Sequence, residues 1–252
     1  MDESPSLTAE LHLATSFLTR LPLPDGGPMA PGGLAAAMRC FPLVGAGLGL
    51  ATAGVHWLAS LWLPGLPAAL LALAALVLLT GALHEDGLAD FADGLGARGD
   101  RERRLDVMRD SRTGSFGVLA LVFSVGLKAS ALAALPSGWV AAGALVAAGA
   151  LSRALMPAAM QAMAPARADG LAASCGVPHA GVAATAVAVA LLLAVLGLGL
   201  TGALAVAVAG GAAAAGVAWL AKRAIGGYTG DVLGAIQQVS EAAILLAAVG
   251  VA

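Results

Sequence analysis

Hydrophobic residues form a series of long segments, separated by short turns and by two polar stretches. A helix needs about 20 consecutive apolar residues to cross a bilayer. The chain contains seven segments of roughly this length, at 42–63, 66–84, 116–135, 138–159, 180–199, 202–221 and 232–252. The pattern therefore predicts an all-α, polytopic membrane bundle with about seven transmembrane helices, in a single domain over residues 1–252.

The segment before the first span has a different pattern. Residues 7–21 place apolar side chains at helical spacing on one face, and Glu10, His12 and Arg20 lie among them. This composition is typical of an amphipathic helix that lies in the membrane interface instead of crossing it. Residues 22–33 are rich in Pro and Gly and predict a loop.

Charge is scarce, and its distribution predicts an orientation. Hydrophobic residues make up 60% of the chain and charged residues only 11%, whereas soluble domains carry about 25% charged residues. Seven spans place the N-terminus and the polar connections 85–115, 160–179 and 221–231 on one side, where the basic residues of the loops gather. The positive-inside rule makes this side cytoplasmic and places the C-terminus outside.

Composition also excludes some classes of protein. A net charge of −2 argues against a nucleic-acid partner. The N-terminal residues lack the basic and apolar regions of a cleaved signal peptide. Cys40 and Cys175 lie far apart, which favours neither a disulfide nor a zinc site.

The stretch from His84 to Gly117 concentrates the charge, with eight of the fifteen acidic residues and six of the thirteen basic ones. Asp86, Asp90 and Asp93 stand at i, i+4 and i+7, on one face of a helix. Like charges at this spacing repel each other, and oxygen ligands favour Mg²⁺ over zinc. The triad therefore predicts a magnesium site and a phosphate-bearing substrate. The alternative is a solvated helix face neutralised by nearby arginines, but a carboxylate directly after an apolar run favours function.

Basic and small residues follow the acidic triad. Arg98, Arg109 and Arg112 have the guanidinium groups that bind phosphate in a fork. Ser111 opens a small-residue run before the third span, where backbone amides suit an anion or a Ser or Thr simply caps the helix. The other arginines of the stretch are predicted to contact lipid headgroups or acidic neighbours on the helix; they are Arg101, Arg103 and Arg104.

Further polar residues lie outside this stretch. The motif at 222–231 is a glycine-rich turn with Thr229 and Asp231, on the same predicted side as the triad, although such a turn can merely connect two helices. Lys128 and Glu241 lie inside predicted spans, so they either pair with each other or face a polar cavity. His84 is either a substrate or metal ligand or a hydrogen-bonded histidine at a helix end.

These groups together predict metal-dependent phosphoryl or phosphodiester transfer. Acidic ligands would hold the metal, basic groups would bind the phosphates, and an acceptor hydroxyl would attack in line. A carboxylate would take the hydroxyl proton. The candidates for these catalytic roles are Asp86, Asp90, Asp93 and Asp110, and the spacing leaves open which one is the base.

Two other functions compete with this prediction. The residues from Asp90 to Arg98 resemble the first half of the CDP-alcohol phosphotransferase signature, which would indicate an enzyme of lipid synthesis. The second half departs from that signature, because Asp106 and Asp110 arrive one residue early and the required Gly is missing. A transporter would use the carboxylates as an ion pathway and would place them near mid-membrane.

Motifs along nearly the whole chain resemble the cobalamin synthase (adenosylcobinamide-GDP ribazoletransferase) family. The strongest is HEDGLAD at 84–90 with Asp93-Gly94. The others, in order, are TRLP at 19–22, FPLVG at 41–45, RDSRTGSFG at 109–117 and GGYTGD at 226–231.

The resemblance implies a polytopic enzyme of the bacterial inner membrane that acts late in cobalamin (vitamin B12) biosynthesis and depends on Mg²⁺. Its substrates would be adenosylcobinamide-GDP and α-ribazole or α-ribazole 5′-phosphate, with the ribazole 3′-hydroxyl as the attacking group and GMP as the leaving group. The bilayer is the expected surrounding, and a homo-oligomer is compatible with the sequence.

The resemblance also implies site residues. The acidic motif of the family falls on the triad, and the C-terminal motif falls on Thr229 and Asp231. Its second polar block falls on Arg109, Asp110, Ser111 and Arg112. Two residues depart from the family pattern, since Glu85 replaces an apolar residue and Phe91 a small hydroxyl residue. The stretch at 237–238, Gln-Gln, also lacks a carboxylate that is often present there.

Overall fold

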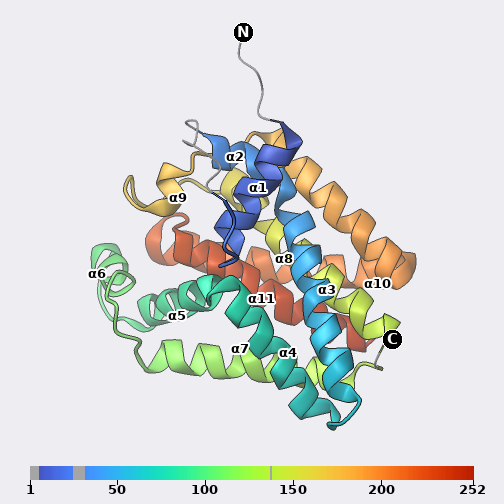
Figure 1. Ribbon diagram of the computed structural model, residues 1–252. Helices are drawn as coiled ribbons and strands as arrows, with labels where there is room; N and C mark the ends of the chain where they lie inside the picture. Colours follow the sequence, from blue (N-terminus) through green and yellow to red (C-terminus); the bar gives the residue numbers. More distant parts are fainter. Residues whose placement is uncertain (1–5, 25–31, 137) are drawn as a thin grey trace.

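The computed structural model describes residues 6–24, 32–136 and 138–252, and these form helices joined by turns, without strands (Figure 1). The prediction of an all-α protein is confirmed. In chain order the helices are α1 (Leu7–Leu18), α2 (Gly33–Ala37), the 3-10 helix η1 (Met38–Cys40), α3 (Phe41–Ser60), α4 (Gly65–Thr80), α5 (Leu83–Gly96), α6 (Arg101–Val107), α7 (Ser115–Ala134), α8 (Trp139–Ala162), α9 (Leu171–Ser174), α10 (Ala180–Ile225) and α11 (Gly230–Val249). The predicted loop at 22–33 lies largely outside the described residues.

The helices agree with the predicted number of spans. Five described helical segments are long and apolar enough to cross a membrane, and α4 with α5 makes a sixth. The 46-residue helix α10 is interrupted at Gly199, where φ is 69° and ψ is 177°. It therefore divides into residues 180–198 and 200–225, and each part is about as long as a membrane span requires. Counted separately, these two parts bring the total to seven.

The second span departs from its prediction, because it is broken instead of continuous. Gly81 ends α4 in the left-handed conformation with φ 66°, which glycine adopts without a steric penalty. Ala82 also has a positive φ, 59°, at a cost of about 1–2 kcal/mol for an L-residue. The two residues turn α5 by 93° relative to α4. The polar stretch thus begins a new helix that packs between α7 and α11.

The polar connections meet at one end of the bundle, as the topology predicts. Tyr228 and the segment beside Pro165 pair through their backbones, with Tyr228 N donating to Ala164 O at 3.0 Å and Ala166 N donating to Tyr228 O at 2.8 Å. Arg109 bonds Asp169 across the same end at 2.6 Å. The connections 97–114, 163–179 and 226–229 therefore lie together.

Two arginines predicted to contact lipid or acidic neighbours also bind the ends of helices; Arg101 contacts its acidic neighbour as well, with its Nη1 3.1 Å from Glu102 Oε1. Arg101 donates to the carbonyl oxygen of Ile225, the last residue of α10, at 2.8 Å and to that of Ala166. Arg104 donates to the Leu95 carbonyl at 2.7 Å, at the end of α5. Cations at helix C-termini satisfy the last carbonyls and interact favourably with the helix dipole. These two side chains fix α6 against the ends of α10 and α5.

Small residues let the spans approach closely. A Cβ on Gly45 of α3 would lie 2.1 Å from the carbonyl oxygen of Gly149 of α8, and a Cβ on Gly149 would lie 2.2 Å from that of Gly45. Such contacts are possible only between glycines, as is typical of closely packed membrane helices. Near the N-terminus the buried Glu10 of α1 accepts two hydrogen bonds from Arg39 of η1. This pair holds the predicted interfacial helix against the bundle.

Candidate active site

Helices α5 and α11 cross at two glycines, and this crossing builds the site. A Cβ on Gly87 would lie 3.0 Å from the Cα of Asp231, and a Cβ on Gly234 would lie 3.1 Å from the carbonyl oxygen of His84. Larger residues at these positions would push the helices apart. The close approach brings Asp231, from the C-terminal motif, next to the acidic face of α5. Two polar motifs that lie far apart in the sequence thus form one site.

The carboxylates at this crossing repel each other. Asp90 lies beyond the apolar part of the broken span, and burial raises its pKa, as do the carboxylates of Asp86, Asp231 and Asp93, to about 7. Like charges and desolvation both disfavour the ionised form. Arg167 offers partial compensation, with its Nη2 3.7 Å from Asp231 Oδ2. Within the described residues the cluster keeps an excess of negative charge, which a bound cation would offset.

Asp93 is held in place by the start of α7. Its Oδ2 accepts from Gly114 N at 2.6 Å and its Oδ1 from Gly117 N at 2.9 Å. A Cβ on either glycine would lie 2.5 Å from a carboxylate oxygen of Asp93. The free amides at the helix N-terminus, predicted to bind an anion, thus bind a carboxylate of the chain itself. Each oxygen keeps a further lone pair for another ligand.

The donor set fits a hard divalent cation that the substrate helps to bind. No three His, Cys, Asp or Glu side chains of residues 6–24, 32–136 and 138–252 converge to hold an ion without help. Mg²⁺, however, usually takes one or two carboxylates and completes its shell with water and substrate phosphate. The carboxylate oxygens of this site, with their excess negative charge, suit a Mg²⁺ ion that shares its shell with water and substrate phosphate.

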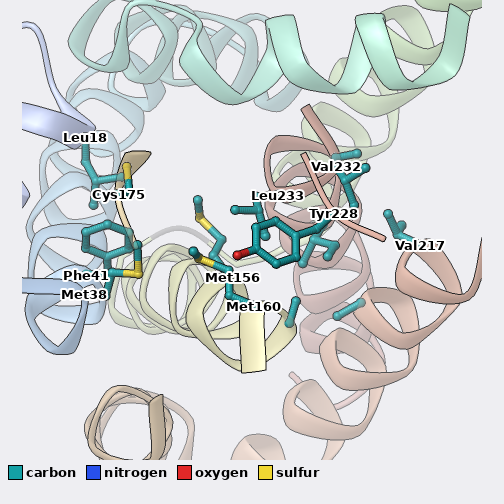
Figure 2. Packing of buried hydrophobic residues seen from close by; sticks show 14 of the residues in the cluster. Leu18, Met38, Phe41, Met156, Met160, Cys175, Val217, Tyr228, Val232 and Leu233 are labelled. Atoms are coloured by element: carbon teal, nitrogen blue, oxygen red, sulfur yellow. The ribbon is translucent and has the colours of Figure 1, made fainter. Parts of the chain in front are cut away.

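A cavity of about 230 Å³ opens beside the carboxylates. Figure 2 shows its apolar walls, with Met38, Phe41 and Cys175 on one side and Met156 and Met160 on the other. Its polar lining residues are His84, Asp86, Arg167 and Asp231. Thr229, the N-cap of α11, is buried and donates to Asp231 Oδ2 at 3.1 Å, which orients that carboxylate.

The predicted residues of the 98–112 segment lie elsewhere. Arg112 bonds Asp110 at 2.6 Å, and these hydrogen bonds lower the pKa of Asp110 to about 2. Arg98, Ser111 and Arg112 are exposed, and Arg109 pairs with Asp169. None of these five residues lines the cavity. The structure therefore brings together His84, Asp86, Asp90, Asp93, Thr229 and Asp231, and it leaves Arg98, Arg109, Asp110, Ser111 and Arg112 on an exposed segment.

Comparison of the sequence with known proteins identifies the family of this chain. A family model described as cobalamin-5-phosphate synthase matches residues 10–249. The chain belongs to the cobalamin-5-phosphate synthase family. This match confirms the resemblance seen in the motifs and decides against the CDP-alcohol and transporter alternatives.

Relatives of the synthase chain carry a consistent name. Adenosylcobinamide-GDP ribazoletransferase of Bradyrhizobium diazoefficiens is 49% identical, covering 96% of this chain and 94% of its own. The proteins of that name from Azorhizobium caulinodans and Rhizobium meliloti are 45% and 43% identical, covering 95% and 92% of both chains, respectively. No solved structure matches the chain.

Next to the acidic site of this synthase lies a network of paired buried charges. Lys128 Nζ lies 3.1 Å from Glu241 Oε2, and Arg153 Nη1 lies 3.6 Å from Glu241 Oε1. Gln238 accepts from Lys128 at 2.7 Å and donates to Glu85 Oε1 at 2.9 Å. Of the two alternatives that the sequence left open for Lys128 and Glu241, the structure shows the pairing. Two departures from the family pattern, Glu85 and Gln238, bond each other in this network.

Sequence reasoning missed two cations of the synthase. Arg153 is fully buried in α8, and its position inside a predicted span carries the same signal that singled out Lys128. Arg167, next to Asp231, lies in a polar loop whose spacing gives no hint of the residues it will face. The backbone pairing of Ala166 with Tyr228 brings Arg167 next to Asp231, and this pairing is visible only in the structure.

Proposed function

We propose that the protein is an adenosylcobinamide-GDP ribazoletransferase. It transfers adenosylcobinamide phosphate to the 3′-hydroxyl of α-ribazole or of α-ribazole 5′-phosphate and releases GMP. Family membership and the common name of relatives up to 49% identical support this activity. The main structural support for this activity is that Asp231 of α11 lies next to Asp86 and Asp90 of α5 where the two helices cross.

The reaction exchanges one phosphorus–oxygen bond for another. The acceptor hydroxyl oxygen bonds to the phosphorus that carries cobinamide, and the bond from that phosphorus to the oxygen bridging the two phosphates breaks. GMP leaves with the bonding electrons, and the hydroxyl proton passes to a carboxylate. Asp231 is suited to take this proton, because it lines the cavity and is oriented by Thr229.

The acidic face of α5 is suited to hold Mg²⁺. Asp86, Asp90 and Asp93 would be its protein ligands, and the ion would neutralise the diphosphate and stabilise the leaving phosphate. Asp93 is fixed by the amides of α7, and Asp90 carries unbalanced charge. Asp110 is a poor base, since Arg112 keeps its pKa at about 2.

We also propose that the site faces the cytoplasm from a bacterial inner membrane, with the N-terminus inside. The polar connections gather at the end of the bundle that holds the acidic site. These connections carry the basic residues that the positive-inside rule places in the cytoplasm. Cytoplasmic labelling of a cysteine introduced at Arg98 in intact and in permeabilised cells tests this orientation.

The activity is tested with purified protein in lipid bilayers. The reaction contains adenosylcobinamide-GDP, α-ribazole 5′-phosphate and Mg²⁺, and GMP and the corrinoid product are followed by chromatography. We expect both products, and we expect EDTA to abolish them. A parallel reaction with a CDP-alcohol donor should release no CMP. Absence of GMP from folded protein that binds both substrates would refute the proposal.

A further inference from the structure

We infer that the cavity beside the carboxylates is the binding site of the acceptor nucleoside, with the apolar walls around its aromatic base and the polar end around its ribose. The inference rests on the proposed function, which supplies two substrates of very different size. It assigns a role to α1, η1, α8 and the segment after α9, none of which carries the acidic motifs.

Size separates the two substrates. The cavity has a volume of about 230 Å³, below the roughly 300–1,000 Å³ of pockets that hold drug-sized ligands. A small aromatic nucleoside is of the right scale, whereas a corrinoid macrocycle with its side chains is far too large to enter. The donor must therefore approach the carboxylates from outside the cavity.

The wall chemistry favours an apolar base. Phe41 and Met38 face Met156 and Met160 across the cavity, and Cys175 lies beside Phe41 (Figure 2). Aromatic rings and thioethers pack well against a flat heterocycle. The lining residues that the structure describes include no Asn, Gln, Ser or Thr. The amino and carbonyl groups of a purine or pyrimidine would thus lack side-chain amide or hydroxyl partners, which disfavours these bases.

The polar end has buried groups that lack partners. His84 is 2% exposed, and its Nε2 has no hydrogen-bond partner among the described residues; the same holds for the buried Nη1 of Arg167. Most buried polar atoms in folded proteins are hydrogen-bonded. Ribose hydroxyls and a 5′-phosphate would satisfy these atoms. Asp231 at the same end would then meet the 3′-hydroxyl.

A second, more open recess adjoins the cavity. Phe17, Leu83 and Asp86 line both spaces, and the recess is further lined by Arg20 and Thr80 near the break between α4 and α5. Two spaces that meet at Asp86 suit a transfer between two substrates. The open recess leaves room for the donor diphosphate, and the enclosed cavity takes the acceptor.

Protection of a native cysteine tests the inference on the unmodified protein. Cys175 lines the cavity and Cys40 does not, although both are buried and free. A small methanethiosulfonate is applied at alkaline pH, because burial raises the pKa of the Cys175 thiol, and modification is followed by mass spectrometry. α-Ribazole should slow modification of Cys175 by about tenfold and leave Cys40 unchanged, and adenosine should protect neither. Equal rates for Cys175 with and without saturating α-ribazole would overturn the inference.

A cavity-filling variant gives an independent test. Met160→Phe should raise the KM for α-ribazole by about tenfold and leave the KM for adenosylcobinamide-GDP unchanged. Met163→Phe, close by on the chain and outside the cavity lining, is the matched control and should leave both constants unchanged. An unaltered KM for α-ribazole in an active Met160→Phe variant would overturn the inference.

The outcomes separate the inference from the proposed function. GMP release by the wild type without protection of Cys175 would keep the reaction and remove the acceptor site from this cavity. Protection of Cys175 without GMP release would support the nucleoside site and refute the reaction. If Met160→Phe does not fold, protection of Cys175 in the wild type decides.

Discussion

Two groups of charged residues lie side by side on the same helices, and they differ in how their charges are balanced. Helix α5 supplies Glu85 to one group and Asp86 and Asp90 to the other. In the first group Glu85 and Glu241 are matched by Lys128 and Arg153, and Gln237 and Gln238 add hydrogen bonds to the two carboxylates. In the second group carboxylates face each other, and Asp90 has a pKa of about 7.

The difference distinguishes a structural role from a chemical one. Taking charges out of water costs several kcal/mol per ion, and the cost is recovered only when each charge is paired and hydrogen-bonded. The paired group largely meets this condition inside the bundle: each charge has an opposite partner, and among the described residues only Glu85 Oε2 and Arg153 Nε of this group lack a hydrogen bond. The acidic group does not, so the protein keeps these carboxylates together at an electrostatic cost that a bound cation would remove. Neighbouring positions on one helix therefore serve opposite purposes.

The largest effect is expected from breaking the paired group. Lys128→Met would leave Glu241 and Glu85 with Arg153 as their only cation in the described network, and it should lower the free energy of unfolding by about 3–5 kcal/mol. Unfolding of the purified variant by SDS titration in mixed micelles measures this change. The double variant Lys128→Met with Glu241→Gln should recover part of the loss, and a single variant as stable as the wild type would contradict the pairing.

Removing one charge from the acidic group should reduce activity without reducing stability. Asp90→Asn should lower kcat by about 10²–10³-fold, because the proposed site loses a ligand of the cation that would stabilise the transition state. Its thermal stability should stay unchanged or rise, since repulsion with its acidic neighbours is relieved. Rates of GMP release and melting temperatures in the same detergent test both expectations. Loss of stability together with activity would mean that Asp90 belongs to the structural group.

The attachment of Asp93 to α7 can be tested with two glycines of that helix. A Cβ at Gly117 would lie 2.5 Å from Asp93 Oδ2, whereas a Cβ at Gly126 would meet nothing within 4 Å. Gly117→Ala should therefore displace the carboxylate and reduce kcat/KM by about tenfold or more, because small misplacements of catalytic groups are costly. Gly126→Ala should leave kcat/KM unchanged. Equal activities of the two variants would show that the position of Asp93 does not matter.

The smallest effect concerns pH. In the proposed site Mg²⁺ would bind the ionised form of Asp90, whose pKa is raised to about 7 by burial and by its acidic neighbours. Above this pH no proton has to be displaced, and below it the apparent affinity should fall by up to about tenfold per pH unit. Isothermal titration of Mg²⁺ across this range measures the slope. Asp90→Asn should remove the dependence, and a flat profile in the wild type would contradict the assigned pKa.

The sequence predicted the parts of the molecule that depend on composition and local periodicity. The spans follow from hydrophobic length, and the common end of the polar connections follows from the number of spans. The acidic face of α5 and the pairing of Lys128 with Glu241 follow from the cost of unpaired charge. These features need no knowledge of which helices touch.

Features that depend on packing could not be read in this way. The break at Gly81 and Ala82 lies inside an apolar run with no proline, so periodicity alone predicts a continuous helix. Asp93 reaches Gly114 and Gly117 only because α5 and α7 are neighbours. Much of the apolar cavity wall comes from α1, η1, α3 and α8, which carry no acidic motif, and these residues look like ordinary core positions in the sequence.

Direct measurement of cation binding tests the contrast between the two groups most closely. Mn²⁺ is titrated by electron paramagnetic resonance into the protein in lipid nanodiscs with the GDP-bearing donor present. Two carboxylate-to-amide variants of the same helix are compared, Asp90→Asn in the acidic group and Glu85→Gln in the paired group. The account predicts that Asp90→Asn weakens Mn²⁺ binding by about tenfold or more and that Glu85→Gln leaves it unchanged. Equal affinities of Asp90→Asn and wild type would contradict the assignment of the acidic group as the cation site.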